Sequence, residues 1–141
     1  MKKTTVFILS IVLLFSCNKD PKDECTTNVT SLSTTYRITA YTYKPTLTSP
    51  EQDYFTILFP DACDRDNNLT LSANGTYVIT DAGMVCAPPR TENGVWSLSG
   101  NNFTLDGDPT VIESFNCQTL VLSFADFMTT GDKMKITLVK Q

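Results

Sequence analysis

The side chains that could carry chemistry in this chain of 141 residues are carboxylates and cysteines, because histidine is absent. Without histidine, neither a Ser-His nor a Cys-His dyad can form, and the commonest metal ligand is missing. The densest acidic segment contains Asp61 and the spaced triplet Asp64, Asp66 and Asn68. That triplet has the spacing of the first ligands of a calcium loop, but the glycine and the bidentate glutamate that complete an EF-hand are missing. We therefore interpret the segment as a solvated loop and predict no metal site.

Glycoside hydrolysis is a reaction for which carboxylates alone can suffice, since it needs two carboxyl groups on opposite sides of the substrate. Asp64 or Asp66 could in principle pair with Glu92 or Glu113. The sequence does not place these residues opposite one another, and the short loops leave little room for a substrate groove. We therefore predict a protein that is not an enzyme, with no catalytic residues and no cofactor.

The first 16 residues have the composition of a secretory signal peptide. Two lysines are followed by a largely apolar segment at residues 6–15. A helix of that length spans about 15 Å, half of a bilayer core, so the segment fits a signal peptide better than a membrane span. Residues 14–17, with the letters LFSC, resemble the lipobox of bacterial lipoproteins. That resemblance implies lipid attachment to the Cys17 sulfur, cleavage before Cys17 and acylation of its new amino group by a fatty acid such as palmitate.

Such an anchor predicts a location in the cell envelope, with the protein lipid-anchored to the outer membrane of a Gram-negative bacterium. Several acyl chains make the attachment effectively permanent. Residues 17–32 are then expected to form the lipidated cysteine and a flexible tether, since the segment after Cys17 is charged and lacks apolar periodicity. Its acidic residues resemble the export signal of surface lipoproteins, and a plain periplasmic spacer is the alternative, so the sequence leaves the membrane face open.

The four remaining cysteines, Cys25, Cys63, Cys86 and Cys117, form an even set in a chain that we expect to be exported, so we predict two disulfides. Three connectivities are possible. We favour Cys63–Cys86, which would join the two flanks of a hairpin over residues 69–79, and therefore Cys25–Cys117, which would tie the end of the tether to the domain. A metal site is the alternative, but no cysteine pair has CxxC spacing.

Short alternating segments separated by turn residues predict an all-β domain over residues 33–141. Asn74-Gly75 is the strongest hairpin signal, because this pair accepts the positive φ angles of a type I′ turn. The expected strands lie around residues 36–41, 55–59, 69–71, 77–79, 96–98, 103–105, 112, 120–124 and 133–138. No segment has the length and periodicity of a crossover helix, so we expect neighbouring strands to pair antiparallel.

A closed up-and-down barrel and a two-sheet sandwich both fit eight or nine antiparallel strands. An immunoglobulin sandwich needs a tryptophan between two distant cysteines that bridge its sheets, and Cys86, Trp96 and Cys117 lie too close together for that pattern. Sequential hairpins favour the barrel. We therefore predict an antiparallel up-and-down eight-stranded β-barrel.

Residues 68–77, 92–105 and 119–123 resemble the bacterial lipocalin-like lipoprotein family in the order and spacing of an apolar strand, an Asn-Gly hairpin, a Gly-x-Trp strand and a Leu-x-Leu strand. The resemblance covers residues 33–141 and implies a lipocalin-like (calycin) barrel and a lipid anchor more than an activity. The family usually has a second Gly-x-Trp in its first strand, and this chain departs from that pattern. For Trp96 we favour packing at the end of the barrel over a role in lining a ligand cavity.

The net charge of −4 excludes nucleic acid as a partner, because nucleic-acid binding needs clustered basic residues. Two function classes remain. By family analogy we favour a membrane-anchored monomer that binds a small apolar or amphipathic ligand, since eight strands enclose room for one. The alternative is a structural or interaction lipoprotein with a filled barrel, which engages a protein or glycan partner through loops at 44–52 and 82–93. The sequence assigns no ligand-binding residues.

Overall fold

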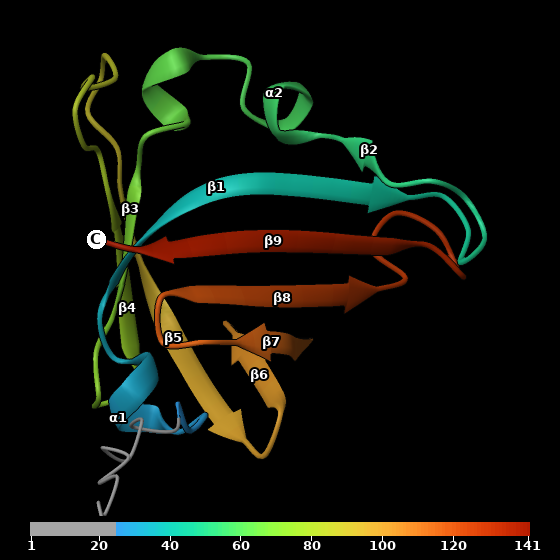
Figure 1. Cartoon of the computed structure of the whole chain (residues 1–141). Coiled ribbons are helices and arrows are strands. Elements are labelled where there is room, and N and C mark those ends of the chain that lie inside the picture. The colour runs from blue at the N-terminus through green and yellow to red at the C-terminus, as the bar shows by residue number, and fades with distance from the viewer. Residues whose placement is uncertain (1–24) are drawn as a thin grey trace, which may run out of the picture.

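The computed structural model describes residues 25–141, which form one antiparallel sheet that closes on itself (Figure 1). The elements in chain order are α1 (Val29–Leu32), β1 (Thr35–Lys44), β2 (Gln52–Asp53), α2 (Phe55–Leu58), the 3₁₀ turn η1 (Ala62–Asp64), β3 (Asn68–Leu71), β4 (Thr76–Thr80), β5 (Thr91–Ser99), β6 (Asn102–Leu105), β7 (Asp108–Phe115), β8 (Thr119–Ala125) and β9 (Lys133–Lys140). The predicted fold class, an all-β antiparallel barrel, is confirmed.

Eight of the nine strands close the barrel, because each strand from β3 to β9 pairs with the next and β9 returns to β1. The β1–β9 seam runs along nearly the whole of β1. The β1–β3 seam covers only residues 35–37. Further along, that edge of β1 pairs instead with the short β2, at Thr42 and Tyr43. The strands β1 and β3 are therefore no longer paired beyond Arg37. The segment that connects them, which contains β2, α2 and η1, spans the gap between the two strands.

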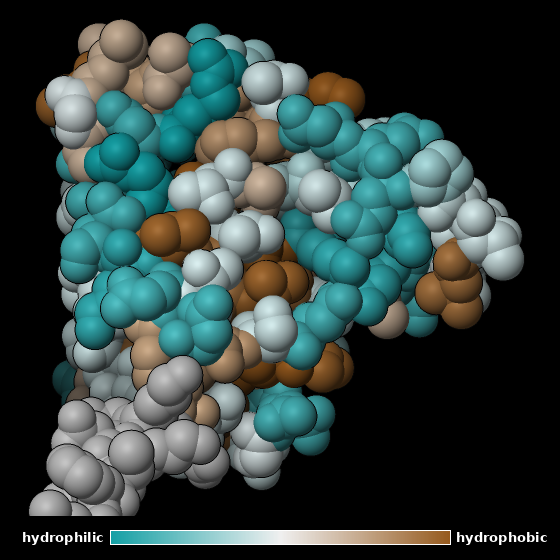
Figure 2. Space-filling model, viewed as in Figure 1, coloured by the Kyte–Doolittle hydropathy of each residue, from teal (hydrophilic) through white to brown (hydrophobic). Residues whose placement is uncertain are grey.

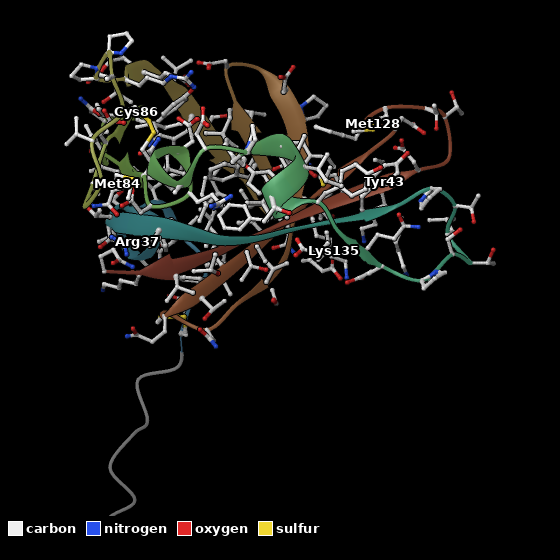
Figure 3. The ribbon with its side chains drawn as sticks, turned by 90° about the horizontal axis from the view of Figure 1, so that it is seen from above. Arg37, Tyr43, Met84, Cys86, Met128 and Lys135 are labelled. Atoms are coloured by element: carbon white, nitrogen blue, oxygen red, sulfur yellow. A yellow bond between two sulfur atoms is a disulfide. The ribbon has the colours of Figure 1, made fainter. Side chains whose placement is uncertain are left out.

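The up-and-down order places successive connections at opposite ends of the barrel. The closed end carries α1 and the turns at residues 72–75, 100–101 and 116–118. The open end carries the connections at residues 45–67, 81–90, 106–107 and 126–132. Figure 3 shows the open end from above, with Met84 and Cys86 on one flank and Tyr43 and Met128 on the other. Figure 2 shows a mainly hydrophilic surface on which apolar side chains emerge in separate patches.

The core fills the closed half of the barrel. Tyr36, Leu32 and Phe103 have no exposed surface, and Leu32 belongs to α1. Trp96 stacks on Phe103 with ring centroids 5.6 Å apart, and its Nε1 donates to the Ser72 carbonyl at 2.9 Å. Trp96 is therefore a packing residue of the closed end, where its apolar ring surface is buried and its indole N–H group has a hydrogen-bond acceptor.

The Gly-x-Trp pattern has a steric cause on β5. A Cβ atom at Gly94 would overlap the ring of Tyr77 and the carboxylate of Asp106. The Tyr77 hydroxyl donates to Asp106, which also accepts the Val95 amide at 2.9 Å. Glycine is needed at this position because the Tyr77 ring crosses directly over the backbone of the neighbouring strand.

Both favoured disulfides are present. Cys25–Cys117 ties the start of the described chain to the β7–β8 turn at the closed end, and Cys63–Cys86 ties η1 to the 81–90 connection at the open end. The sequence predicts a tether over residues 17–32. Its last part, residues 25–32, belongs to the folded domain, because the buried Leu32 side chain completes the core. The predicted signal peptide and the lipid attachment at Cys17 lie outside the described residues.

The strand predicted over residues 55–59 is wrong, because this segment forms α2. Its apolar residues fit alternation, but Phe55 and Phe59 are also four apart, which places them on one side of a helical turn. Both rings pack on Tyr41 of β1, with centroids 6.0 and 5.2 Å away. Packing against a neighbouring strand thus decided between two patterns that the sequence allows equally. Among residues 25–141, no helix is long and apolar enough to cross a membrane.

Candidate functional site

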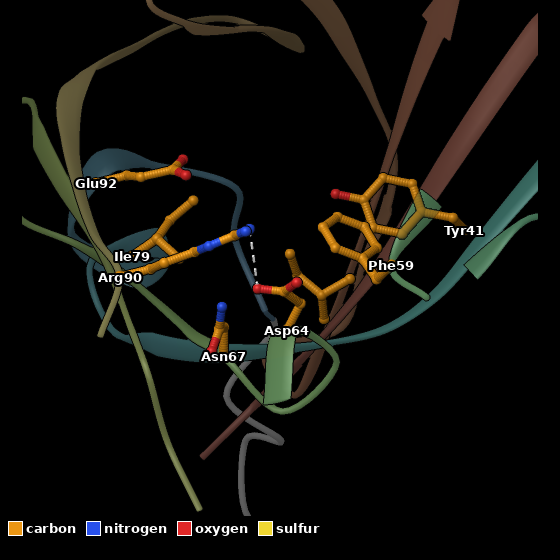
Figure 4. Close-up of a pocket in the computed structure, with 8 residues that line it drawn as sticks. Tyr41, Phe59, Asp64, Asn67, Ile79, Arg90 and Glu92 are labelled. Carbon is orange, nitrogen blue, oxygen red and sulfur yellow. Dashed lines mark hydrogen bonds and ion pairs between the residues drawn. The ribbon is translucent and has the colours of Figure 1, made fainter. Parts of the chain in front are cut away.

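A pocket of about 220 Å³ opens where β1 and β3 have separated (Figure 4). Its walls come from β1, the end of α2, η1 and the loop after it, β4, and the chain that enters β5. The lining residues are Ile38, Tyr41, Phe59, Asp64, Asn67, Ile79, Arg90 and Glu92. We call this space the mouth pocket. It exists because the connection at residues 45–67 replaces direct pairing of two strands with an irregular bridge.

A smaller cavity of about 70 Å³ lies deeper in the barrel. It shares Ile38, Tyr41 and Ile79 with the mouth pocket, so the two spaces adjoin. Its other lining residues are Leu69, Tyr77, Leu105, Leu122, Ile136 and Leu138. The mouth pocket therefore offers polar groups, while the adjoining cavity offers mainly aliphatic side chains. The buried rings of the closed half limit its depth.

One wall of the mouth pocket is aromatic. Tyr41 and Phe59 lie side by side on it, opposite Arg90 and Glu92 (Figure 4). Burial first, and then the nearby negative charge of Glu92, raise the pKa of the Tyr41 phenol to about 12. Tyr41 therefore stays neutral at physiological pH and acts as a hydrogen-bonding group instead of a base or nucleophile.

The opposite wall is charged. The Arg90 guanidinium contacts Asp64 Oδ1 at 3.2 Å, and the side chain of Asp64 is 8% exposed while that of Arg90 is 59% exposed. Cys86 lies 3.4 Å from the same oxygen. Asp64 and the two cysteines of this disulfide bring their ligand atoms within 4.8 Å of one another. The sulfurs are bonded to each other and cannot act as thiolate ligands, so this cluster does not form a metal site.

The acidic segment that we interpreted as a solvated loop is instead partly buried and structural. Asp66 Oδ2 accepts the Met84 amide at 2.7 Å, and Asp81 Oδ2 accepts the Arg90 amide at 2.8 Å. Backbone N–H groups in an irregular connection need acceptors, and these carboxylates supply them. The interpretation as a solvated loop was therefore wrong for Asp64 and Asp66, while Asp61 is exposed.

The structure separates the carboxylates that were considered together. Asp64 and Glu92 line the same pocket. Asp66 holds the 81–90 connection, and Glu113 lies elsewhere, in ion pairs with Lys133 at 3.1 Å and Lys135 at 3.0 Å. The possible pairings of Asp64 or Asp66 with Glu113 are thus wrong. Asp64 is the carboxylate that could still act together with Glu92 in glycoside hydrolysis, but it forms an ion pair with Arg90.

Sequence reasoning missed most of the pocket lining. The sequence pattern identifies Ile38 and Tyr41 only as residues of a strand. It also places Phe59 in a strand, whereas this residue follows the helix α2. The signal that was available is the length and aromatic content of the connection at residues 45–67, since long connections in compact domains are commonly functional.

Comparison with known proteins agrees with this architecture. A family model for a lipocalin-like domain matches residues 23–136. A search among curated proteins finds no significant match. The matched segment runs from just before Cys25 to the middle of β9 and includes the other barrel strands in full. The chain therefore belongs to the lipocalin-like domain family.

Proposed function

We propose that this protein binds a small apolar or amphipathic molecule in the mouth pocket, with the apolar part of the ligand extending into the deeper cavity. The observation that carries the proposal is that the two spaces adjoin, with Ile38, Tyr41 and Ile79 in the walls of both. Concave sites with mainly apolar walls and a few polar groups are typical of small-molecule binding. The family supports this function, because its barrel encloses room for one small ligand.

Filling the pocket tests the proposal. We expect Ile79→Trp to abolish binding of the neutral fluorescent probe N-phenyl-1-naphthylamine, because the indole would occupy the space shared by both cavities. Val95→Trp is the matched control, since Val95 is 58% exposed on the next strand. Fluorescence titration measures both variants against the unchanged protein. Failure of the unchanged protein to bind the probe, or equal binding by Ile79→Trp, would contradict the proposal.

The natural ligand can be sought directly. Native mass spectrometry of the protein purified from its own cells, without denaturation, is expected to show an added mass that disappears in Ile79→Trp. An added mass that persists in this variant would place the bound molecule outside the pocket.

We also propose that the protein is a lipoprotein monomer, anchored through Cys17 to the outer membrane. The support is the sequence at residues 1–17, with its basic start, apolar segment, small residue and cysteine. Cys17→Ala should move the protein from the membrane fraction to the soluble fraction, as measured by fractionation and immunoblotting. Continued membrane association of this variant would contradict the anchor.

Recognition of a partner through the loops is a second candidate function. Met84 and Val85 are each 59% exposed in the 81–90 connection, and exposed apolar loop residues on a rigid scaffold are suited to recognition. The double substitution Met84→Ser, Val85→Ser should leave probe binding unchanged if the pocket is the functional site. Loss of a partner that crosslinks to the unchanged protein in intact cells, with normal probe binding by the variant, would favour the loop function.

A further inference from the structure

We infer that the mouth pocket selects ligands whose polar end carries a positive charge, such as a primary amine on an apolar chain. This inference deepens the proposed function and rests on it. It comes from the distribution of charge around the mouth, where two carboxylates and one guanidinium line the pocket and one carboxylate is left over.

Glu92 is the carboxylate that is left over. It lies near the start of β5, and its exposed side chain stands on the same side of the pocket as Ile79 and Arg90 (Figure 4). Within residues 25–141 it makes no ion pair and no side-chain hydrogen bond, although Arg90 is only two residues away. A cationic group of a ligand could therefore pair with Glu92 without breaking an existing ion pair or side-chain hydrogen bond of this residue.

Arg90 is not equally available to an anion. Its guanidinium is committed to Asp64, whose side chain is nearly buried. An anionic ligand that contacts Arg90 has to share this cation with Asp64, whose negative charge already offsets the charge of Arg90 and repels a second anion. An anion in the pocket would also be repelled by Glu92, which carries the same sign of charge. The geometry therefore disfavours a carboxylate or phosphate head group.

The negative charge of Glu92 also contributes to the pKa values of two tyrosines that line the cavities. Besides Tyr41, it contributes to the raised pKa of Tyr77, which is about 12 and is due first to burial and then to the Asp106 hydrogen bond. Tyr77 lines the deeper cavity. Because Glu92 lines the mouth pocket itself, its charge also acts on a ligand bound there.

The aromatic wall supports the same preference. Tyr41 and Phe59 form one side of the mouth, facing the charged wall (Figure 4). An ammonium group in the pocket is attracted by Glu92 on one side and by the negative quadrupole of the aromatic rings on the other. Beyond them, Ile38 and Ile79 lead into the aliphatic cavity. In the part of the chain that is described, no lysine lines either space.

The test compares three ligands that share an eight-carbon chain, namely octylamine, 1-octanol and octanoate, at pH 7 by isothermal titration calorimetry. We expect octylamine to bind at least tenfold more tightly than octanoate, with octanol between them. Glu92→Gln should weaken octylamine by about fivefold to tenfold and leave octanol unchanged, because a partly exposed charge pair contributes a modest amount. Added salt should reduce the difference between amine and alcohol.

The matched control is Asp108→Asn, which removes one negative charge from an exposed position outside both cavities and should leave all three affinities unchanged. Glu92→Lys should reverse the order, so that octanoate binds more tightly than octylamine. The charge preference would be overturned if the unchanged protein bound octanoate as tightly as octylamine or more tightly. It would also be overturned if Glu92→Gln bound octylamine with the affinity of the unchanged protein. Either result would leave the proposed binding pocket intact. Failure of all three ligands and of the neutral probe would overturn the proposed function itself.

Discussion

At the closed end of the barrel, Leu32, Trp96 and Phe103 are at most 4% exposed and pack as a continuous apolar cluster. At the open end, the connections are held largely by carboxylates that accept backbone hydrogen bonds. The clearest case is Asp132, which is 2% exposed and accepts the amides of residues 127–129 at 2.6–2.9 Å and the Tyr43 hydroxyl at 2.9 Å. The two ends are thus held by different forces.

This difference explains how the same short barrel can contain both a core and a pocket. Apolar packing fills space, so the closed half has little room left for a ligand. Hydrogen bonds that backbone amides donate to Asp66, Asp81 and Asp132 order the open-end connections without filling the space beneath them. The mouth pocket stays open because polar contacts at its rim, instead of packed side chains, hold the connections around it in place.

Removal of the closed-end tryptophan should have the largest effect. Trp96→Ala is expected to lower the free energy of unfolding by about 3–5 kcal/mol, because it removes buried apolar surface and leaves a cavity. Urea denaturation followed by circular dichroism measures the change. A loss below about 1 kcal/mol would show that packing of this indole does not hold the closed end.

Removal of the buried open-end carboxylate should have the next largest effect. Asp132→Asn is expected to cost about 2–3 kcal/mol, since the amide cannot accept all the hydrogen bonds that the carboxylate accepts and its N–H₂ faces donors. Asp126→Asn is the control in the same connection, because Asp126 is exposed and accepts one amide, from Gly131. Equal costs for the two variants would contradict the special role of Asp132.

Acid should loosen the open end before the closed end. Burial alone would raise the pKa of Asp132, but hydrogen bonds from the amides of Thr129 and Met128 and from Tyr43 outweigh it and hold this pKa below its usual value. A carboxyl whose pKa is lowered on folding stabilises the fold above its unfolded pKa, about 4, and this stabilisation is lost as the pH falls through the lower folded pKa.

Hydrogen exchange can locate this effect. Below about pH 4, protection factors at residues 127–129 should fall, while those near Trp96 and Phe103 should persist. In Asp132→Asn the protection at residues 127–129 should be low and independent of pH. A simultaneous loss of protection at both ends in the unchanged protein would break the comparison.

A surface ion pair should matter least. Lys135 contacts Glu51 at 2.7 Å and Glu113 at 3.0 Å, but its side chain is 24% exposed and those of its partners are 38% and 36% exposed. Lys135→Gln is therefore expected to lower the free energy of unfolding by less than about 1 kcal/mol. The cost should shrink further in high salt. A cost as large as that of Asp132→Asn would show that partly exposed charges, as well as buried ones, stabilise this barrel.

Features encoded locally were predictable from the sequence. Alternation and the Asn74-Gly75 turn identified the barrel, and an even number of cysteines with a hairpin between two of them identified the disulfides. Trp96 could be assigned to packing because it follows a glycine on a strand. The pocket was not predictable in the same way, because it depends on where β1 leaves β3.

Tertiary contacts decided the features that sequence reasoning missed. Phe55 and Phe59 fit a strand or a helix until Tyr41 is placed beside them. Asp64 and Asp66 look like solvated acids until the 81–90 connection brings its amides and Arg90 against them. In each case the deciding partner lies far away in the chain, so no local pattern records it.

The Cys25–Cys117 disulfide has a consequence for orientation. It fixes the point at which the chain enters the domain at the pole opposite the mouth pocket. If the protein is held to a bilayer through Cys17, as proposed, the attachment reaches the domain on the side away from the mouth pocket. The disulfide then leaves the mouth free to take up a molecule from the aqueous compartment.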